Sequence, residues 1–299
     1  MTNILEHISI KNIKKGKSIK VKRLKEGHIP EITEFNTAVI SFGSIFNKYK
    51  NFTVAGKNRI KQSRPEFRII MFEQNLKAEL KVLSHLANSG NPNDAEERFL
   101  YQKTLSKIYQ AMVEESNKEN EKDKLVLLLE RGSLLIGSFY QNQGKKVASV
   151  LAKRLDMADG TFGLGLSNLI IPKKKYFQKL HIQEDCIASG DSIAGVIFYL
   201  YKMAYRFEVV QIDCAVAVQK GVEFLKDFLL LLGIKKILFK TGGICYRVDE
   251  HFYLRRTKME GYSRGEFYVG DMGSWSEPLP VDYNSKAVWN KKRVINNLN

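Results

Sequence analysis

Two adjacent carboxylates and a short polar turn form the stretch of this chain best suited to chemistry. Glu184 and Asp185 follow an apolar run, and Ser189-Gly190-Asp191-Ser192 comes after three further residues. The carboxylates can accept hydrogen bonds from ribose hydroxyls or hold a hydrated Mg²⁺. The turn opens an amphipathic helix, so its backbone N–H groups and hydroxyls can bind a phosphate at the helix N-terminus. The stretch therefore indicates a site for a phosphorylated sugar.

The same residues also have a purely structural interpretation. In an ordinary strand-to-helix connection, Ser189 or Asp191 caps the helix and no ligand is involved. The acid pair at a fixed offset before the turn favours the functional interpretation. A carboxylate beside a phosphate is repulsive, so Asp191 either points away from a bound phosphate or indicates a different ligand.

Alternating strands and helices are expected to position these residues. Apolar runs predict strands at 125–129, 147–151, 209–218 and 234–239, and the strand of the acid pair is expected to open at His181. Helical spacing predicts a helix over 222–232 closed by Gly233, and another after the turn, with Ile193, Ile197, Leu200 and Ala204 buried. The pattern predicts an α/β fold with a mostly parallel central sheet and helices on both faces. Ligands of such sheets bind beyond the carboxyl ends of the strands.

Two further helices are predicted upstream. One buries Leu76, Leu80, Leu83 and Leu86 and ends at Gly90; the other follows a turn at 91–94 and buries Tyr101, Leu105, Ile108 and Met112. The charged run from Glu114 to Lys124 is expected to be an exposed connection.

Composition favours a globular protein with an anionic partner. The 299 residues carry a net charge of +16 and are 44% hydrophobic, and no apolar run is long enough to cross a membrane. Three scattered cysteines and the absence of a signal-peptide pattern indicate a cytoplasmic location. Up to Glu66 there are 14 Lys and Arg residues against 5 Glu, so residues 1–65 are predicted to be a basic extension and 66–299 the main domain. Such charge attracts nucleic acid, but it also suits small anions.

The order of motifs resembles the type I phosphoribosyltransferases, and among them the uracil phosphoribosyltransferases. Their loop for phosphoribosyl pyrophosphate (PRPP) has four apolar residues, two acids and then Thr/Ser-Gly-Gly-Thr/Ser. Glu184 and Asp185 take the acidic positions and Ala188 matches the usual alanine, whereas Asp191 replaces a glycine.

Three other segments extend the resemblance. Residues 128–133 resemble the strand and Leu-Arg-Ala-Gly loop that holds pyrophosphate, with Arg131 and Gly132 in the loop. Lys153 and Arg154 fall where the family has a mobile β-hairpin flap. Residues 267–274 resemble the glycine-rich uracil-binding segment through Gly270, Asp271 and Gly273. A surface Arg, a solvated hairpin and a surface turn are the structural alternatives.

The resemblance implies transfer of phosphoribosyl from PRPP to uracil or a related nucleobase, with release of pyrophosphate and with Mg²⁺ as cofactor. Glu184 and Asp185 would hold the ribose hydroxyls and the metal, and the backbone of Ala188, Ser189, Gly190, Asp191 and Ser192 the 5′-phosphate. Arg131, Gly132 and Arg154 would bind pyrophosphate. Gly270, Asp271 and Gly273 would frame the base, and the family commonly forms homo-oligomers.

Two other functions stay open. One is a binding module that keeps a PRPP or nucleotide pocket and uses its basic surface on RNA or DNA, as favoured by Asp191 and the basic extension. The other is a divergent ribosyl-transfer enzyme of a conflict or modification system. The five histidines form no ligand pair, so a zinc site is not expected.

Overall fold

In the part of the chain that the structure describes, the strands form one nine-stranded sheet in the order β1-β2-β6-β5-β4-β7-β8-β9-β3. The computed structural model describes residues 8–12, 38–42, 66–91, 94–118, 123–129, 134–142, 147–156 and 162–245. The strands are β1 (Ile8–Asn12), β2 (Ala38–Phe42), β3 (Glu66–Met71), β4 (Lys124–Leu129), β5 (Ala148–Asp156), β6 (Phe162–Ile170), β7 (Tyr176–Ile187), β8 (Arg206–Val218) and β9 (Lys236–Cys245). The helices are α2 (Lys77–Ser89), α3 (Ala95–Lys118), α4 (Leu134–Asn142), α5 (Asp191–Lys202) and α6 (Gln219–Leu231).

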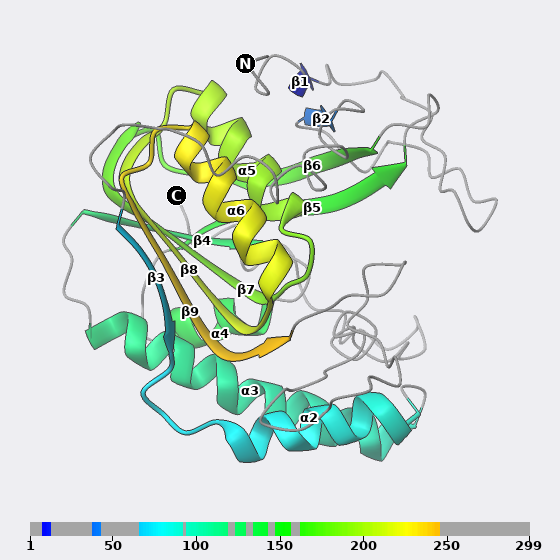
Figure 1. The fold of residues 1–299 in the computed structure, drawn as a ribbon. Helices are drawn as coiled ribbons and strands as arrows, with labels where there is room; N and C mark the ends of the chain where they lie inside the picture. The colour runs from blue at the N-terminus through cyan, green and yellow to red at the C-terminus, as the bar shows by residue number, and fades with distance from the viewer. Residues whose placement is uncertain are drawn as a thin grey trace.

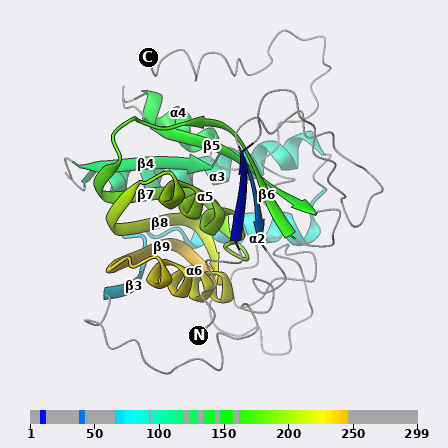
Figure 2. The same ribbon diagram turned by 90° about the horizontal axis from the view of Figure 1, so that it is seen from above.

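The central part of the sheet is parallel. Every pair in the run β5-β4-β7-β8-β9-β3 is parallel, whereas β6, β2 and β1 continue the sheet from β5 in antiparallel pairs. Figure 2 shows this progression from β3 at one edge to the antiparallel strands at the other. The predicted mostly parallel α/β sheet is confirmed.

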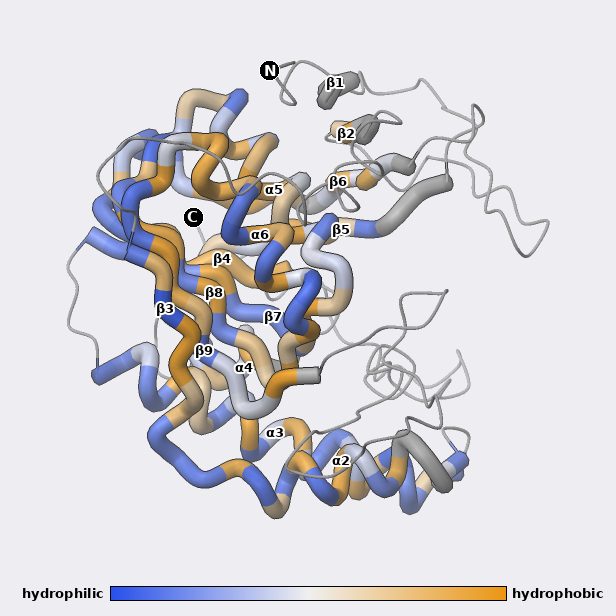
Figure 3. Tube along the Cα trace, viewed as in Figure 1, coloured by the Kyte–Doolittle hydropathy of each residue, from blue (hydrophilic) through white to orange (hydrophobic). Residues whose placement is uncertain are grey.

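Helices cover both faces of the parallel part, as Figure 1 shows. On one face, Leu180 and Ile212 of the central strands share a buried cluster with Ile197 of α5 and Phe228 of α6. On the other face, residues of α2, α3 and α4 form a second buried cluster with strand residues such as Val216. In Figure 3, apolar and hydrophilic residues alternate along α2 and α3, as expected for helices with one buried side. Both faces of the central strands are therefore enclosed.

The predicted upstream helices are confirmed. Leu76, Leu80, Leu83 and Leu86 are buried, and α2 ends with Gly90 as its C-cap. Asp94 caps the N-terminus of α3, because its Oδ1 accepts hydrogen bonds from the backbone N–H groups of Glu96 and Glu97 at 3.0 and 2.9 Å. The four residues predicted to be buried on α3 are fully buried.

Three predictions about element boundaries are wrong. The run from Glu114 to Lys124 is not simply an exposed connection, because α3 continues to Lys118 and buries Glu115 and Ser116 against polar partners. The strand of the acid pair opens at Tyr176 rather than at His181, and its first part alternates exposed and buried side chains. Ala204 is not on the buried face of α5, because it follows the helix with φ of 67° and is exposed.

The predicted hairpin consists of β5 and β6. These strands pair antiparallel, from Asp156 opposite Phe162 to Ser149 opposite Ile170. The other edge of β6 pairs with β2, and β2 pairs with β1. Two strands from the segment 1–65, predicted as an extension, therefore lie in the central sheet. The division of the chain at residue 65 stays a prediction.

None of the helices that the structure describes is both long and apolar enough to cross a bilayer.

The turn after β7 packs tightly against the first turn of α6. A methyl group on Gly221 would lie 2.1 Å from the carbonyl oxygen of Ala188, and one on Gly190 would lie 2.8 Å from Cγ of Leu225. Gly190 also has φ of 81°, which other residues rarely adopt. Glycine at both positions thus fixes how closely this turn approaches α6.

We expect Gly221→Ala to lower the free energy of unfolding by about 2 kcal/mol, because the contacted atom belongs to the backbone and the turn must shift. Gly137→Ala in α4 is the matched control. Its methyl group would lie 3.3 Å from a flexible Leu128 side chain, and alanine favours a helix, so we expect a change smaller than about 1 kcal/mol. Urea unfolding measures both; equal effects would contradict the tight contact.

Candidate functional site

The order of the parallel strands creates a switch point between β4 and β7. From β4 the chain passes through α4 to β5 on one side, and from β7 it passes through α5 and β8 to β9 on the other. The two helices lie on opposite faces of the sheet, since α4 contributes to the α3 cluster and α5 to the opposite cluster. Connections that diverge in this way leave a crevice at the carboxyl ends of the strands, where open α/β sheets bind ligands.

The acid pair lies near the carboxyl end of β7, at this switch point. Glu184 and Asp185 are 8% and 7% exposed. Oε1 of Glu184 accepts a hydrogen bond from the N–H of Asp185 at 3.2 Å, and Oδ1 of Asp185 accepts one from the N–H of Cys186 at 2.7 Å. One oxygen of each carboxylate is thus bonded to local backbone, which restricts the orientation of both side chains.

The negative charge of the pair reaches its neighbours. Burial raises the pKa of Tyr109 on α3 well above its usual value, and the charges of Asp185 and Glu184 raise it further. Burial also raises the pKa of Cys186, again with the two carboxylates adding to the effect. Because both groups stay protonated at neutral pH, neither is suited to act as a base or a thiolate nucleophile.

The phosphate-type turn follows directly. Gly190 is the N-cap of α5 in the left-handed region, and α5 begins at Asp191. The side chain of Asp191 is buried, and its Oδ2 accepts a hydrogen bond from the Ser189 hydroxyl at 2.7 Å. Ser192 and Ala188 are partly exposed. The turn therefore places a left-handed glycine and a buried carboxylate at the N-terminus of α5, the helix end that favours negative charge.

The hairpin extends past this edge. β4 ends at Leu129, which pairs with Val150, while the parallel β5 continues to Asp156. Lys153 and Arg154 consequently lie on the part of β5 that projects beyond the carboxyl end of β4. Their backbones pair with Gly165 and Leu164 of β6. The predicted pyrophosphate residue Arg154 is thus placed at the same edge as the acid pair.

The other predicted site residues lie outside the described part of the chain. Arg131 and Gly132 belong to the connection between Leu129 and Leu134, that is, between the carboxyl end of β4 and α4. Gly270, Asp271 and Gly273 follow β9 in the sequence. Their roles stay predictions.

The residues present fit Mg²⁺ only in a limited way. Among the described residues, no group of three or more His, Cys, Asp or Glu side chains could hold a metal ion. Mg²⁺ commonly keeps several waters and is bound by one or two carboxylates together with substrate phosphates. Glu184 and Asp185 therefore suit a metal that arrives with a phosphorylated ligand, not a protein-only metal centre.

A row of buried polar side chains leads along β7 to the acid pair, and the sequence reasoning missed it. Alternate residues of β7 and β8 that are polar and buried are Lys179, His181, Gln183, Asp185, Gln211 and Asp213. Gln183 and His181 are bonded to α3, through the carbonyl of Met112 at 3.5 Å and the hydroxyl of Ser116 at 3.2 Å. In the sequence, polar residues recur at every second position of strands that are expected to be buried on both faces. This alternation could have revealed the row.

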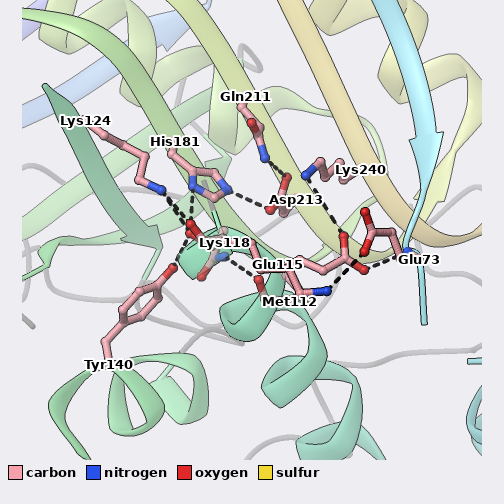
Figure 4. A network of polar contacts seen from close by, with 12 residues as sticks. Glu73, Met112, Glu115, Lys118, Lys124, Tyr140, His181, Gln211, Asp213 and Lys240 are labelled. Carbon is pink, nitrogen blue, oxygen red and sulfur yellow. Dashed lines mark hydrogen bonds and ion pairs between the residues drawn. The ribbon is translucent and has the colours of Figure 1, made fainter. Parts of the chain in front are cut away.

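Figure 4 shows the polar contacts around the middle of this row. Here His181 of β7 links Asp213 of β8 to Ser116 of α3. Nε2 of His181 lies 2.7 Å from Oδ2 of Asp213, and Nδ1 lies 3.2 Å from Oγ of Ser116. Ser116 also accepts a hydrogen bond from the Tyr140 hydroxyl at 3.0 Å, and Lys124 bonds its carbonyl at 2.9 Å. His181 and Asp213 are fully buried and Ser116 nearly so. A substrate cannot reach this serine, so the chain of bonds is structural.

Comparisons with known proteins show only distant similarity. No protein-family model and no curated protein sequence matches the chain. Among solved structures, it is similar to the AQ2163 protein from Aquifex aeolicus, with 16% identity, a TM-score of 0.46, and 62% of this chain and 91% of that chain covered. It is also similar to adenine phosphoribosyltransferase from Thermoanaerobacter pseudethanolicus, with 16% identity, a TM-score of 0.32 and 49% and 86% covered.

A third similar structure is orotate phosphoribosyltransferase from Aeropyrum pernix, with 15% identity, a TM-score of 0.32 and 50% and 76% of the two chains covered. Scores of this size describe a partial likeness and assign the chain to no family. The particular likeness to uracil enzymes stays a prediction.

We expect His181→Ala to lower the free energy of unfolding by about 3 kcal/mol or more, because the buried carboxyl group of Asp213 would lose its imidazole partner. Tyr140→Phe removes one hydroxyl from the same network and is the milder comparison, with an expected loss of about 1 kcal/mol. Urea unfolding at neutral pH measures both. A loss for His181→Ala no greater than that for Tyr140→Phe would show that the network does not stabilise the fold.

Proposed function

We propose that this protein binds PRPP at the switch point between β4 and β7 and transfers its phosphoribosyl group to uracil or a related nucleobase. The single observation that carries the proposal is the acid pair at the carboxyl end of β7, followed by a left-handed glycine that opens α5. This sequence of strand, carboxylates, turn and helix lies where the sheet topology leaves a ligand crevice.

The chemistry requires little covalent participation by the protein. Displacement of pyrophosphate at C1′ needs an oriented ribose, cations on the leaving group and a positioned base. Glu184 and Asp185 would accept hydrogen bonds from the ribose hydroxyls, and their restricted orientation would order the sugar. Mg²⁺ bound together with PRPP would neutralise charge on the leaving pyrophosphate.

Cationic residues would bind the leaving group. Arg154 lies on the projecting part of β5, and Arg131 belongs to the connection that follows β4. A guanidinium can bind phosphate oxygens in a fork, which suits both residues for pyrophosphate. Gly270, Asp271 and Gly273 would frame the base, as the resemblance implies.

We expect Asp185→Asn to weaken Mg²⁺-dependent PRPP binding by roughly 10- to 100-fold, because it removes a charged acceptor for the sugar and the metal. Isothermal titration of the full chain with PRPP, with and without Mg²⁺, measures the effect. Glu208→Gln is the matched control. This substitution also removes one carboxylate from a parallel strand, but at the exposed amino end of β8. There Glu208 accepts a hydrogen bond from the Tyr176 hydroxyl. Unchanged binding by Asp185→Asn would remove the acid pair from the site.

The reaction itself is tested by pyrophosphate release from PRPP with a panel of nucleobases. Release with uracil or a related pyrimidine supports the proposal, and release only with purines changes the acceptor. PRPP binding without release with any base would leave a binding protein in place of an enzyme.

A regulator that binds nucleotides and nucleic acid is the second candidate. Two observations favour it: the buried carboxylate of Asp191 in the phosphate-type turn, and the excess of Lys and Arg up to Glu66, with 14 basic residues against 5 acidic. Basic surfaces bind nucleic acid through phosphate contacts that are strongly weakened by salt.

For this candidate, fluorescence anisotropy with a labelled 20-nucleotide RNA or DNA should show affinity that falls about 100-fold from 50 to 200 mM salt, as about four phosphate contacts require. Replacing Lys14, Lys15 and Lys17 together by Gln should weaken binding. The same change at Lys173, Lys174 and Lys175, an exposed basic run before β7, is the matched control. Equal effects of the two triples would indicate binding through net charge alone.

A further inference from the structure

Strand β3 forms one edge of the sheet and leaves a row of backbone groups open. Among the strands that the structure describes, β3 pairs only with β9, as Figure 2 shows. The N–H of Phe72 donates to the carbonyl of Thr241, and the register is unbroken, so the even-numbered residues of β3 face β9. Because backbone groups alternate along a strand, the N–H and C=O groups that face away from β9 are those of Phe67, Ile69 and Met71.

The side chains along this edge are apolar and exposed. Ile69, Ile70 and Met71 are 43%, 37% and 48% exposed. Edge strands of soluble proteins are usually protected by lysine, proline, a bulge or an inward-pointing charge, because an open strand can pair with another chain. The pairing of β3 with β9 has no bulge, and none of these three residues is charged or proline. β3 therefore has the properties of an edge that another strand covers.

A second copy of the same strand fits this edge. A two-fold axis perpendicular to the sheet relates two such strands in antiparallel orientation. With the axis at Ile69, this residue lies opposite its own copy, and Phe67 lies opposite Met71 of the second copy. Residues that exchange both backbone hydrogen bonds in an antiparallel pair are those whose N–H and C=O groups face the other strand. This register therefore uses all three outward-facing residues of both chains.

The side chains that this register brings together are complementary. Phe67, Ile69 and Met71 lie on the same face of β3, so the two chains together present one uninterrupted apolar row. In this row isoleucine meets isoleucine, and the methionine sulfur meets an aromatic ring, which is a favourable contact. Pairing would thus remove from water the apolar side chains that a single chain exposes.

The charges at the two ends of the edge also suit an antiparallel pair. Arg68 and Lys236 lie 2.8 and 3.5 Å from Glu66, so the amino end of the edge carries a positive excess. The antiparallel arrangement separates the amino ends of the two copies and places each near Glu73 of the other. Glu73 follows the carboxyl end of β3, pairs with Lys118, and has a side chain that is 76% exposed. No like charges lie directly opposite each other in this register.

We propose that β3 is a dimer interface, at which two copies of this chain pair antiparallel about a two-fold axis at Ile69. The two sheets then join into one continuous sheet. The switch point lies between β4 and β7 in the interior of each sheet, so the interface leaves it open. The inference does not depend on which ligand binds there.

Light scattering coupled to size-exclusion chromatography tests the interface, because one full chain has a mass of 34.3 kDa. We expect the native chain at twice this mass. Ile69→Lys places like charges directly opposite each other at the axis, so it should weaken dimerisation about 100-fold or more. Phe99→Lys is the matched control, since Phe99 is an apolar residue of α3 that is 66% exposed, and this variant should stay dimeric. A monomeric native chain, or equal masses of the two variants, would overturn the proposal.

A mixture of two variants tests the position of the axis. Ile69→Lys and Ile69→Glu should each be monomeric, whereas an equal mixture should form dimers with one chain of each, because lysine then lies opposite glutamate. Recovery of the dimer also shows that both variants are folded. A mixture that stays monomeric would overturn the axis at Ile69, and single variants that remain dimeric would overturn the role of this edge.

Discussion

The hydrogen bond between His181 and Asp213 is the interaction on which the arrangement of the site depends. The imidazole joins the two central strands β7 and β8, and its other nitrogen reaches Ser116 of α3, which is bonded in turn to α4 and β4. Five elements that surround the switch point are thereby held by one chain of buried polar contacts. Because an unpaired polar group costs much in a dry interior, this network defines one relative position of these elements. The network therefore holds β7, the strand that carries Glu184 and Asp185, against α3 and β8.

The same row of polar residues explains why the acid pair is partly enclosed. Asp185 continues the alternation of His181 and Gln183 along β7. Burial raises the pKa of Tyr109 on α3, and the nearby Asp185 raises it further. A carboxylate at the end of such a row is held by the fold before any ligand arrives. Orientation in advance is what a ribose site needs, since the sugar then loses less freedom when it reacts. The same strand, β7, therefore carries both the buried polar row and the carboxylates of the proposed site.

The turn after β7 shows how one substitution can redirect a shared backbone. Its left-handed glycine and its close approach to α6 make a tight turn at the N-terminus of α5, and the buried side chain of Asp191 belongs to it. A parallel sheet with a switch point allows many ligands, and the side chains of a few loop residues select among them. The enzyme and the regulator considered above differ mainly in what this turn and the basic segment bind.

Much of the fold was predictable from the sequence by itself. Helical spacing of leucines predicted α2, and apolar runs predicted the central strands, because secondary structure follows local periodicity. The acid pair and its turn were also predictable, because their residues are neighbours in the sequence. The strand order and the burial of Glu115, Ser116 and Asp191 were decided only by tertiary structure. The bonds of His181 join residues 65 and 32 positions apart, and no local pattern specifies which distant side chain will compensate a buried charge.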